Sequence, residues 1–470
     1  MRNSRCEPLM QGSACESLLR MKLSLATSLC LVMLVVSLFA NSVHAQQPSS
    51  VTVQQTTAGP PGVYVIRNAR IVTVSGPEIE SGTIVLRDGK IEAVGATANA
   101  PAGALEIDAR GLIVYPGMVD AGTSMGLVEI DSGAPGTVDL AELGDMNPNA
   151  QAIVAVNPHS AHVNVTRVNG VTSVVTMPLG GVISGQAALI NLDGTTPREM
   201  AVVPSVALVI NFPRVSNRSF DSFFNPQQTN ITEAITARDR QLDQLRKMLR
   251  DAEAYGKAQD AYAHDQTLPR PNRNVQLASL VPFVRGERIV IFRADREMEI
   301  RAALRFADEM HMRPVILGGN EAWKAVSVLK ERNVPVILTG VLDLPPREDD
   351  FYDSLYENAA KLQQAGVRFC ISTGDTGAHV RDLPFHAGMS AAFGLPRAEA
   401  LKAVTLYPAQ IMGVSDRMGS IEPGKMANLV ITDGDLLEAR THVRYLFING
   451  RQLPLTSRHT ELYDQFKNRR

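Results

Sequence analysis

Three residues that could do chemistry lie in one short stretch near the end of the chain. Asp375 follows the apolar run VRFCIS, and His379 and His386 come soon after it. An aspartate at the end of a buried strand can act as a general base or as a metal ligand. The surrounding sequence TGDTG is also typical of a turn, in which Asp375 would cap its own loop. Both roles for Asp375 stay open on these grounds.

A second pair of histidines lies in NPHSAHVNVTRVNG, where Pro158 is typical of the first turn of a helix. In a βα barrel, helices begin at the end of the barrel where the strands finish. His159 and His162 could therefore approach Asp375 and form a displaced His/Asp site that suits zinc or another transition metal. The alternative is that both are helix-start and surface histidines with no ligand.

The elements that must position these residues alternate between strand and helix from residue 114 to 415. Apolar runs of strand length are separated by stretches of helical pattern such as EMEIRAALRFADEM; these runs are GVTSVVTM, VPSVALVI, RIVIF, RPVILGG, VPVILTG and VRFCIS. Strands buried on both faces and joined by helices predict a parallel sheet, and this number of them predicts a closed barrel. The expected fold class is therefore α/β, with a (β/α)8 TIM-type barrel.

One helical insertion interrupts the barrel at about residues 216–275. Within it Leu242, Leu245, Leu249 and Ala252 fall on one face of a charged helix. We expect this face to pack on the barrel, and a coiled-coil interface with a partner is the alternative.

Short alternating runs outside the barrel predict a second domain. Residues 63–113 and 416–453 read as strands and hairpins, with two-residue turns at Asp88-Gly89 and Asn449-Gly450. Neither piece has enough strands to bury a face alone. We therefore expect a composite β-sandwich domain built from both termini, preceded by a linker at 46–62 and followed by a tail at 454–470.

The first 45 residues predict a signal peptide with an extra segment ahead of Met21. The apolar run 23–40 is followed by NSVHA, with small residues Val43 and Ala45 before the expected cleavage site. Cleavage after Ala45 would send the protein to the periplasm or outside the cell and leave no stable membrane span. It would also leave Cys370, in an apolar run, as a buried thiol. A membrane anchor is the alternative, because the run is just long enough to span.

Composition restricts the partners. The chain is 45% hydrophobic and 20% charged, with a formal net charge of -2, so it lacks the basic excess that nucleic-acid binding requires. We expect a small-molecule ligand or substrate and no nucleic acid, and an oligomer is possible.

Two longer segments carry a resemblance to a known family. GLIVYPGMVDA begins the barrel, and ALKAVTLYPAQIMGVSDRMGSIEPGKMANLVI leads from it back into the β-domain. Over residues 63–453 this arrangement resembles the amidohydrolase superfamily, nearest its imidazolonepropionase-like and dihydroorotase-like members. The resemblance implies a hydrolase that acts on non-peptide carbon–nitrogen bonds of a small cyclic amide. It also implies that the Gly-rich segment 178–194 is a top loop that could close over a ligand, with Gly181 and Gln186 as binding residues.

The resemblance implies a metal site as well, held by an HxH pair, two later histidines, often a lysine, and an aspartate. Carried over by position, the HxH pair falls on Gly122 and Ser124. The later histidines fall on Phe292 or Arg293 and on Gly318 or Gly319, and Asp375 alone keeps the family's residue type. Catalytic zinc needs three protein ligands, so we expect the ancestral zinc-type site to be altered or lost.

Arg293 would place a fixed cation where the family has a metal ligand. It could bind an anionic substrate or ligand with two parallel hydrogen bonds. It could instead form a buried ion pair with Asp375 or Asp295. Two functions remain open. The first is a hydrolase with an altered metal site, in which Asp375 would be catalytic and His379 would bind substrate. The second is a noncatalytic ligand-binding or assembly protein that retains the barrel.

Overall fold

The computed structural model describes residues 62–130, 134–215 and 230–469. The expected signal peptide and almost all of the expected linker lie outside these ranges. Within them, no helix is both long and apolar enough to cross a membrane.

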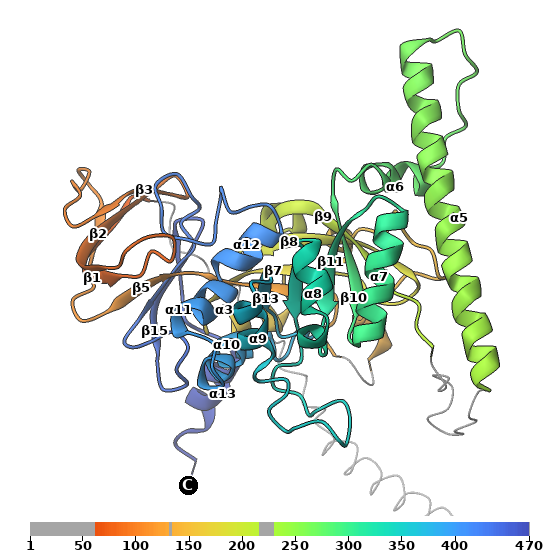
Figure 1. The fold of residues 1–470 in the computed structure, drawn as a ribbon. Helices are drawn as coiled ribbons and strands as arrows, with labels where there is room; N and C mark the ends of the chain where they lie inside the picture. Colours follow the sequence, from red (N-terminus) through yellow and green to blue (C-terminus); the bar gives the residue numbers. More distant parts are fainter. Residues whose placement is uncertain (1–61, 131–133, 216–229, 470) are drawn as a thin grey trace, which may run out of the picture. The chain divides into compact units, whose positions relative to one another are not determined.

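Strands from both ends of the described chain form one eight-stranded sheet (Figure 1). Its strands are β1 (Tyr64–Ile71), β2 (Ile79–Arg87), β3 (Lys90–Gly95), β4 (Leu105–Asp108), β5 (Ile113–Pro116), β14 (Leu429–Thr432), β15 (Val443–Ile448) and β16 (Arg451–Leu453). The order is β16-β15-β14-β5-β1-β2-β3, and β4 pairs with β1. β5 and β14 run antiparallel, with Leu429 opposite Pro116. The sequence pattern predicted a sandwich here; backbone pairing joins all eight strands into a single sheet.

The second sheet is the barrel. Its strands are β6 (Met118–Thr123), β7 (Val171–Thr176), β8 (Ile183–Asn191), β9 (Ala201–Asn211), β10 (Ile289–Ala294), β11 (Arg313–Gly318), β12 (Val336–Leu338) and β13 (Phe369–Ile371), paired in sequence order. The edge strands β6 and β13 contact one another, so the sheet is nearly closed. The expected α/β class with a TIM-type barrel is confirmed.

β8 departs from an all-parallel barrel. It pairs antiparallel with both β7 and β9, whereas the other barrel pairs are parallel. The resemblance placed a Gly-rich loop at this position, but residues 183–191 form a strand whose nine residues are all buried. The segment VISGQAALIN is mostly apolar, so it can occupy a buried place in the sheet. Its polar side chains Gln186 and Ser184 are tolerated there because both form hydrogen bonds.

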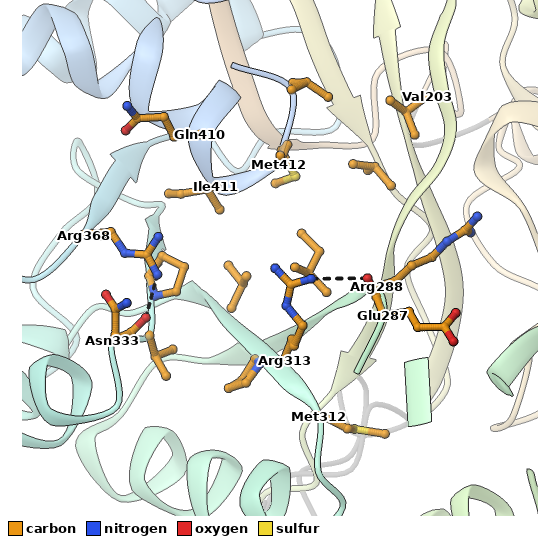
Figure 2. Close-up of a pocket in the computed structure, with 18 of the residues that line it drawn as sticks. Val203, Glu287, Arg288, Met312, Arg313, Asn333, Arg368, Gln410, Ile411 and Met412 are labelled. Atoms are coloured by element: carbon orange, nitrogen blue, oxygen red, sulfur yellow. Dashed lines mark hydrogen bonds between the residues drawn. The ribbon is translucent and has the colours of Figure 1, made fainter. Parts of the chain in front are cut away.

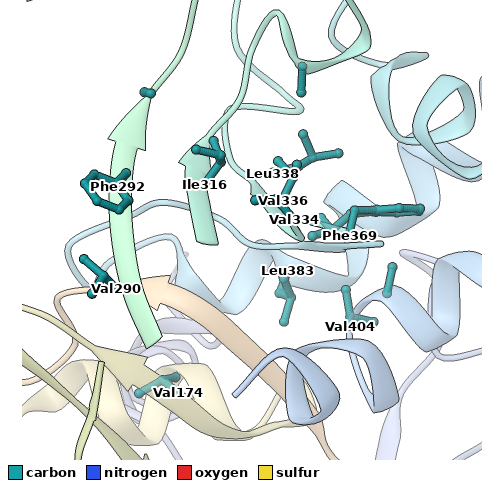
Figure 3. Packing of buried hydrophobic residues seen from close by; sticks show 14 of the residues in the cluster. Val174, Val290, Phe292, Ile316, Val334, Val336, Leu338, Phe369, Leu383 and Val404 are labelled. Atoms are coloured by element: carbon teal, nitrogen blue, oxygen red, sulfur yellow. The ribbon is translucent and has the colours of Figure 1, made fainter. Parts of the chain in front are cut away.

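Alternate residues of the barrel strands enter two different cores. Residues that point inward come from all eight strands and form one cluster, including Val119, Val175, Leu189, Val209, Ile291, Leu317, Ile337 and Cys370. Their neighbours along the strands, such as Val290, Phe292, Ile316 and Leu338, pack against the surrounding helices (Figure 3). This alternation decides which residue of each strand can reach the barrel interior.

Helices cover the outside of the barrel. They are α2 (Ala152–Ala155), α3 (Ala161–Arg167), α4 (Pro197–Met200), α5 (Ile231–His264), α6 (Val275–Val284), α7 (Glu297–Glu309), α8 (Val326–Glu331), α9 (Asn358–Ala365), α10 (Leu383–Ala392), α11 (Arg397–Ala403), α12 (Leu406–Ile411) and α13 (Arg458–Phe466), with short 3-10 turns at Pro135–Thr137, Ala322–Lys324 and Val380–Asp382. α7 contacts β10 and β11, and α5 packs along α6. Leu245, Leu249 and Ala252 of α5 are buried, as the apolar stripe predicted.

Candidate ligand site at the barrel mouth

A cavity of about 300 Å³ lies where the barrel strands end. Six strands or the residues just after them line it, and the helix that follows β10 closes one side. The lining consists of Gly122, Asn211, Phe212, Arg214, Arg293, Ala294, Asp295, Glu299, Leu317, Gly318, Thr339 and Gly374. In a βα barrel this end carries the ligand and the chemistry. The volume is at the lower end of the range for small-molecule sites.

Asp120 connects the two edge strands of the barrel sheet, β6 and β13. Its carboxylate accepts hydrogen bonds from Thr373 N (3.1 Å) and Thr373 Oγ1 (2.6 Å), and from Ser372 Oγ. Ser372 and Thr373 directly follow β13, whereas Asp120 lies on β6, so these bonds join the two edge strands. Burial raises the pKa of Asp120, and the hydrogen bonds oppose that rise. The carboxylate is fully buried, and its hydrogen bonds hold the barrel sheet closed.

The positions that correspond to the HxH pair are filled by other groups. A Cβ on Gly122 would stand 2.8 Å from both Leu317 Cδ1 and Ser372 Oγ. Ser124 donates its hydroxyl hydrogen bond to the carbonyl oxygen of Met177 at 2.9 Å. A side chain at Gly122 would require Leu317 and Ser372 to shift, and the Ser124 oxygen is already engaged.

The positions on β10 and β11 are equally unsuited to a metal. Phe292 points outward and packs edge-to-face on Phe212, with ring centroids 6.2 Å apart. Arg293 therefore is the residue that lines the cavity. A Cβ on Gly318 would stand 2.3 Å from Asp295 Oδ1, and Gly318 has a φ of +104°. Only glycine fits there without strain.

These residues do not fit the zinc that the superfamily implies. The donor positions supply glycine, a hydrogen-bonded serine and a guanidinium, whereas catalytic zinc takes three protein ligands from imidazole, thiolate and carboxylate. Among the described residues, no group of three or more His, Cys, Asp or Glu side chains is placed to hold a metal ion.

Arg293 and Asp295 give the cavity its electrostatic character. Both side chains are largely buried. In the described part of the chain, Arg293 forms no ion pair within 4.0 Å, and its buried Nε has no hydrogen-bond partner. Burial lowers the pKa of Arg293. Burial, and then the charge of Glu299, raises the pKa of Asp295, while Arg214 and Arg293 act against that rise. The direct ion pair considered for Arg293 is therefore not formed with Asp375 or with Asp295.

Asp375 caps the loop that follows β13. Its Oδ1 accepts hydrogen bonds from Gly377 N at 2.9 Å and from His379 N at 3.2 Å. Its neighbour Gly374 lines the cavity. His379 is exposed, and its Nδ1 lies 3.1 Å from Asp382 Oδ2. The geometry of Asp375 is that of the turn-capping alternative.

The other histidines lie around this loop without converging on one point. His162 Nε2 is 3.0 Å from the carbonyl oxygen of Glu129, and its ring lies beside Gly377. The backbone N–H of His159 donates to Asn157 Oδ1. α3 begins at Ala161, with Ser160 as its capping residue, so both histidines lie near a helix start. His386 is buried on α10.

Gly181 and Gln186 have different surroundings. The carbonyl oxygen of Gly181 accepts a hydrogen bond at 2.7 Å from Asn211 Nδ2, which places Gly181 beside a cavity residue. Gln186 lies inside β8, where it donates to the carbonyl oxygen of Pro148 at 2.9 Å and accepts from Ser205 Oγ. Gln186 is absent from the described lining of the mouth cavity.

Sequence reasoning missed four polar residues of the cavity, namely Asn211, Arg214, Thr339 and, on α7, Glu299. Asn211, Arg214 and Thr339 each come at or after the end of an apolar strand. That placement was the available signal, because side chains at the carboxyl ends of barrel strands meet at the mouth.

Comparison with known proteins adds the family. The model of the amidohydrolase family matches residues 294–453, which run from the end of β10 to the end of β16. This match identifies residues 294–453 as amidohydrolase-like and supports the resemblance of the chain to that superfamily. The solved structure of an amidohydrolase from Thermotoga maritima shares the superfamily fold, with a TM-score of 0.73, 24% identity, and coverage of 83% of this chain and 99% of that one.

Curated superfamily relatives match more weakly. Amidohydrolase tasK of Hapsidospora irregularis is 25% identical over 413 residues, 79% of this chain and 39% of that protein. N-acetylglucosamine-6-phosphate deacetylase of Haemophilus influenzae is 51% identical over 37 residues, 8% of this chain and 10% of that protein. The chain thus spans two fifths or less of the length of these relatives.

Proposed function

We propose that this protein uses its barrel mouth to bind a small carboxylate ligand without a metal ion. The observation that supports the proposal is what surrounds the positions to which the resemblance carries the metal ligands. Leu317, Ser372 and Asp295 occupy the space that side chains at Gly122 and Gly318 would need. A cavity of about 300 Å³ remains beside them, with Arg293 in its lining.

The charges of the cavity favour a ligand with one carboxylate. Arg293 has an unpartnered buried Nε, and a guanidinium binds carboxylate with two parallel hydrogen bonds. Arg214 lies near enough to Asp295 to lower its pKa, so a second cation faces the same space. Asn211 and Thr339 add neutral hydrogen-bonding groups to the lining, which suit an amide.

Hydrolysis is a second candidate, favoured by Asp295. Burial and the neighbouring Glu299 raise the pKa of this carboxyl, and a raised pKa suits a group that exchanges protons near neutral pH. In this alternative Asp295 would act as the general base for a water that attacks a non-peptide amide. Glu299 is engaged elsewhere, since its Oε2 accepts from the backbone N–H groups of Asp295 and Arg296.

The test is calorimetric titration of the purified protein with a panel of small carboxylates, led by pyroglutamate, a cyclic amide. We expect pyroglutamate to bind and its uncharged counterpart pyrrolidone not to bind. Arg293→Met should weaken binding about tenfold or more, which corresponds to roughly 1.4 kcal/mol, because one charge-assisted interaction is lost. Arg444→Met is the matched control, because Arg444 lies on β15 and pairs with Asp433.

The same samples separate the two candidates. Release of the ring-opened product, lost in Asp295→Asn while binding is kept, would favour the hydrolase. Binding without turnover would favour the ligand-binding protein. Failure of every panel member to bind, or equal binding to wild type and Arg293→Met, would overturn the proposed site.

We also propose that the protein is exported and that its signal peptide is removed after Ala45. The support is the sequence alone: an apolar run at 23–40 followed by small residues Val43 and Ala45.

A further inference from the structure

A second and larger hollow, of about 630 Å³, lies at the opposite end of the barrel from the mouth. Figure 2 shows this hollow in close-up. Its lining comes from the beginnings of β9, β10 and β11, from the residues just before β12 and β13, and from the segment after α12. On β10 the hollow reaches Ile289, whereas the mouth cavity begins at Arg293. The hollow is therefore a separate feature from the mouth.

The charges that line this hollow are strongly one-sided. Five arginines line it, namely Arg288, Arg313, Arg332, Arg368 and Arg417, and Glu287 is the one acidic residue among the described lining. The whole chain carries a formal net charge of -2, so this excess of cations is local. Cations gathered in a concave surface focus a positive potential that attracts anions.

Four of these arginines have no carboxylate partner within 4.0 Å among the described residues. Arg288 Nη1 donates to Ser205 Oγ at 2.9 Å, and Arg368 Nη2 donates to the carbonyl oxygen of Asn333 at 2.7 Å. Arg313 Nη1 donates to the carbonyl oxygen of Glu287 at 3.3 Å. The fourth is Arg417, whose Nη1 is 3.5 Å from the carbonyl oxygen of Val202.

These neutral oxygens orient the guanidinium groups and leave their charge uncompensated. Each bond uses one N–H of a group that carries five, so donors remain for a ligand. Arg332 differs, because its Nη1 lies 2.7 Å from Asp308 Oδ2. The arginines are therefore not a network of surface ion pairs, which is the ordinary reason for such a cluster.

The floor of the hollow is apolar. Ile411, Met412 and Val414 line it from the segment around the end of α12, and Val206 and Val315 line it from β9 and β11. In Figure 2 the guanidinium group of Arg313 lies near the middle of the view, with Arg368 and Ile411 to one side of it. A ligand that matches both features has an apolar body and more than one negative charge.

We propose that this hollow binds a small dianion with a compact apolar part, such as an aryl phosphate or an aromatic dicarboxylate. Arginine forks bind phosphate and carboxylate in the same bidentate way, so the shared chemistry is the oxyanion. The inference is independent of the mouth, since no residue lines both cavities.

The test is calorimetric titration of the full chain with phenyl phosphate and phthalate, and with phenol as the uncharged probe. We expect saturable binding of both dianions, no binding of phenol, and weaker binding at high sodium chloride because exposed charges are screened. The double variant Arg313→Gln/Arg368→Gln should weaken binding at least tenfold. Arg301→Gln, an arginine paired with Glu297 on α7, and Arg444→Gln, an arginine paired with Asp433, should leave the affinity unchanged.

Circular dichroism would show that the double variant is folded, and Arg288→Gln provides a second variant if it is not. Absence of saturable binding of both dianions to the wild type would overturn the proposal. Equal binding to the wild type and a folded variant would overturn it too, as would an equal loss of affinity in Arg301→Gln. Binding of phosphatidylglycerol vesicles without binding of either dianion would contradict it in favour of a membrane surface.

Discussion

At the scale of single residues, Gly318 occupies a position of the barrel mouth at which a side chain would be strained. Its φ of +104° is strained for any residue with a Cβ, and that Cβ would meet Asp295 Oδ1 at 2.3 Å. We expect Gly318→Ala to destabilise the protein by about 2–4 kcal/mol, from backbone strain of about 1–3 kcal/mol plus the steric contact. Urea unfolding followed by circular dichroism would measure the change.

The matched control for this substitution is Gly103→Ala. Gly103 also has a positive φ, of +77°, but a Cβ there would meet nothing within 4 Å. Both positions have a positive φ, so Gly318→Ala should cost more than Gly103→Ala because it adds the contact with Asp295 and a φ farther from the left-handed helical value. Equal losses of stability would show that Asp295 yields freely and that this position is not closed.

His386 predicts a pH dependence of stability. It is buried, its Nδ1 has no hydrogen-bond partner among the described residues, and burial lowers its pKa even though Asp382, Asp343 and Asp375 act against that shift. An unfolded histidine titrates at about 6.5, so below this pH the unfolded chain takes up a proton that the folded chain refuses. Stability is therefore present above about pH 6.5 and is lost as the pH falls towards the folded pKa.

Replacement of His386 by glutamine should remove this part of the pH dependence. Urea midpoints at about pH 7.5 and about pH 5.5 would be compared for wild type, His386→Gln and the exposed control His442→Gln. We expect the smallest fall in midpoint for His386→Gln. A fall identical to that of His442→Gln would mean that His386 protonates freely in the folded protein.

At the scale of elements, a buried amide network joins the composite sheet to the barrel. Asn428 Nδ2 donates to Ser173 Oγ at 3.2 Å and to Asn191 Oδ1 at 3.0 Å, and Asn428 Oδ1 accepts from Asn449 N at 2.9 Å. Ser173 lies on β7 and Asn191 on β8, whereas Asn428 precedes β14. These bonds connect the two sheets.

Asn428→Ala should destabilise the protein by about 2–4 kcal/mol, because it leaves buried partners without hydrogen bonds and creates a small void. Asn99→Ala, at an exposed position, is the control and should have an effect within about 0.5 kcal/mol. Thermal unfolding by calorimetry would measure both variants. If both lost the same small amount, the network would contribute little to joining the sheets.

The strands could be predicted from the sequence because most of them are apolar on both faces, as in the run RIVIF of β10. β8 was misread as a loop because Gly180, Gly181 and Gly185 are typical of turns. β8 is a strand because its backbone pairs with β7 and β9, and its buried Gln186 bonds to Pro148 and Ser205; such long-range partners leave no mark in a local pattern.

The two cavities differ in how far the sequence reveals them. Gly122, Arg293 and Gly318 could be placed at the mouth because family motifs surround them, and all three line the cavity there. The arginines of the second hollow are spread from Arg288 to Arg417. Only the closure of the barrel brings the beginnings of their strands together, so a reading of local motifs could not group them.

At the scale of the whole molecule, the proposed export makes a direct prediction about the mature chain. Signal peptidase acts after small residues that follow an apolar run, so the exported protein should begin at Gln46. N-terminal sequencing of protein recovered from the exported fraction would measure this. Retention of residues 23–40 in that protein would instead show that the run is an anchor, and Ala45→Arg is expected to block cleavage and keep the longer form.

Whether a metal ion occupies the barrel mouth is tested most directly by elemental analysis of natively purified protein. The mouth supplies no imidazole at the ancestral positions, and a guanidinium beside the site would repel a divalent cation. We predict zinc, manganese, iron and nickel each well below one equivalent per chain, and no binding in a calorimetric titration with zinc. The claim that the mouth holds no metal would be contradicted by about one equivalent of zinc per chain in the wild type. That zinc would have to be lost in Asp375→Ala and to return when zinc is added to metal-free wild type.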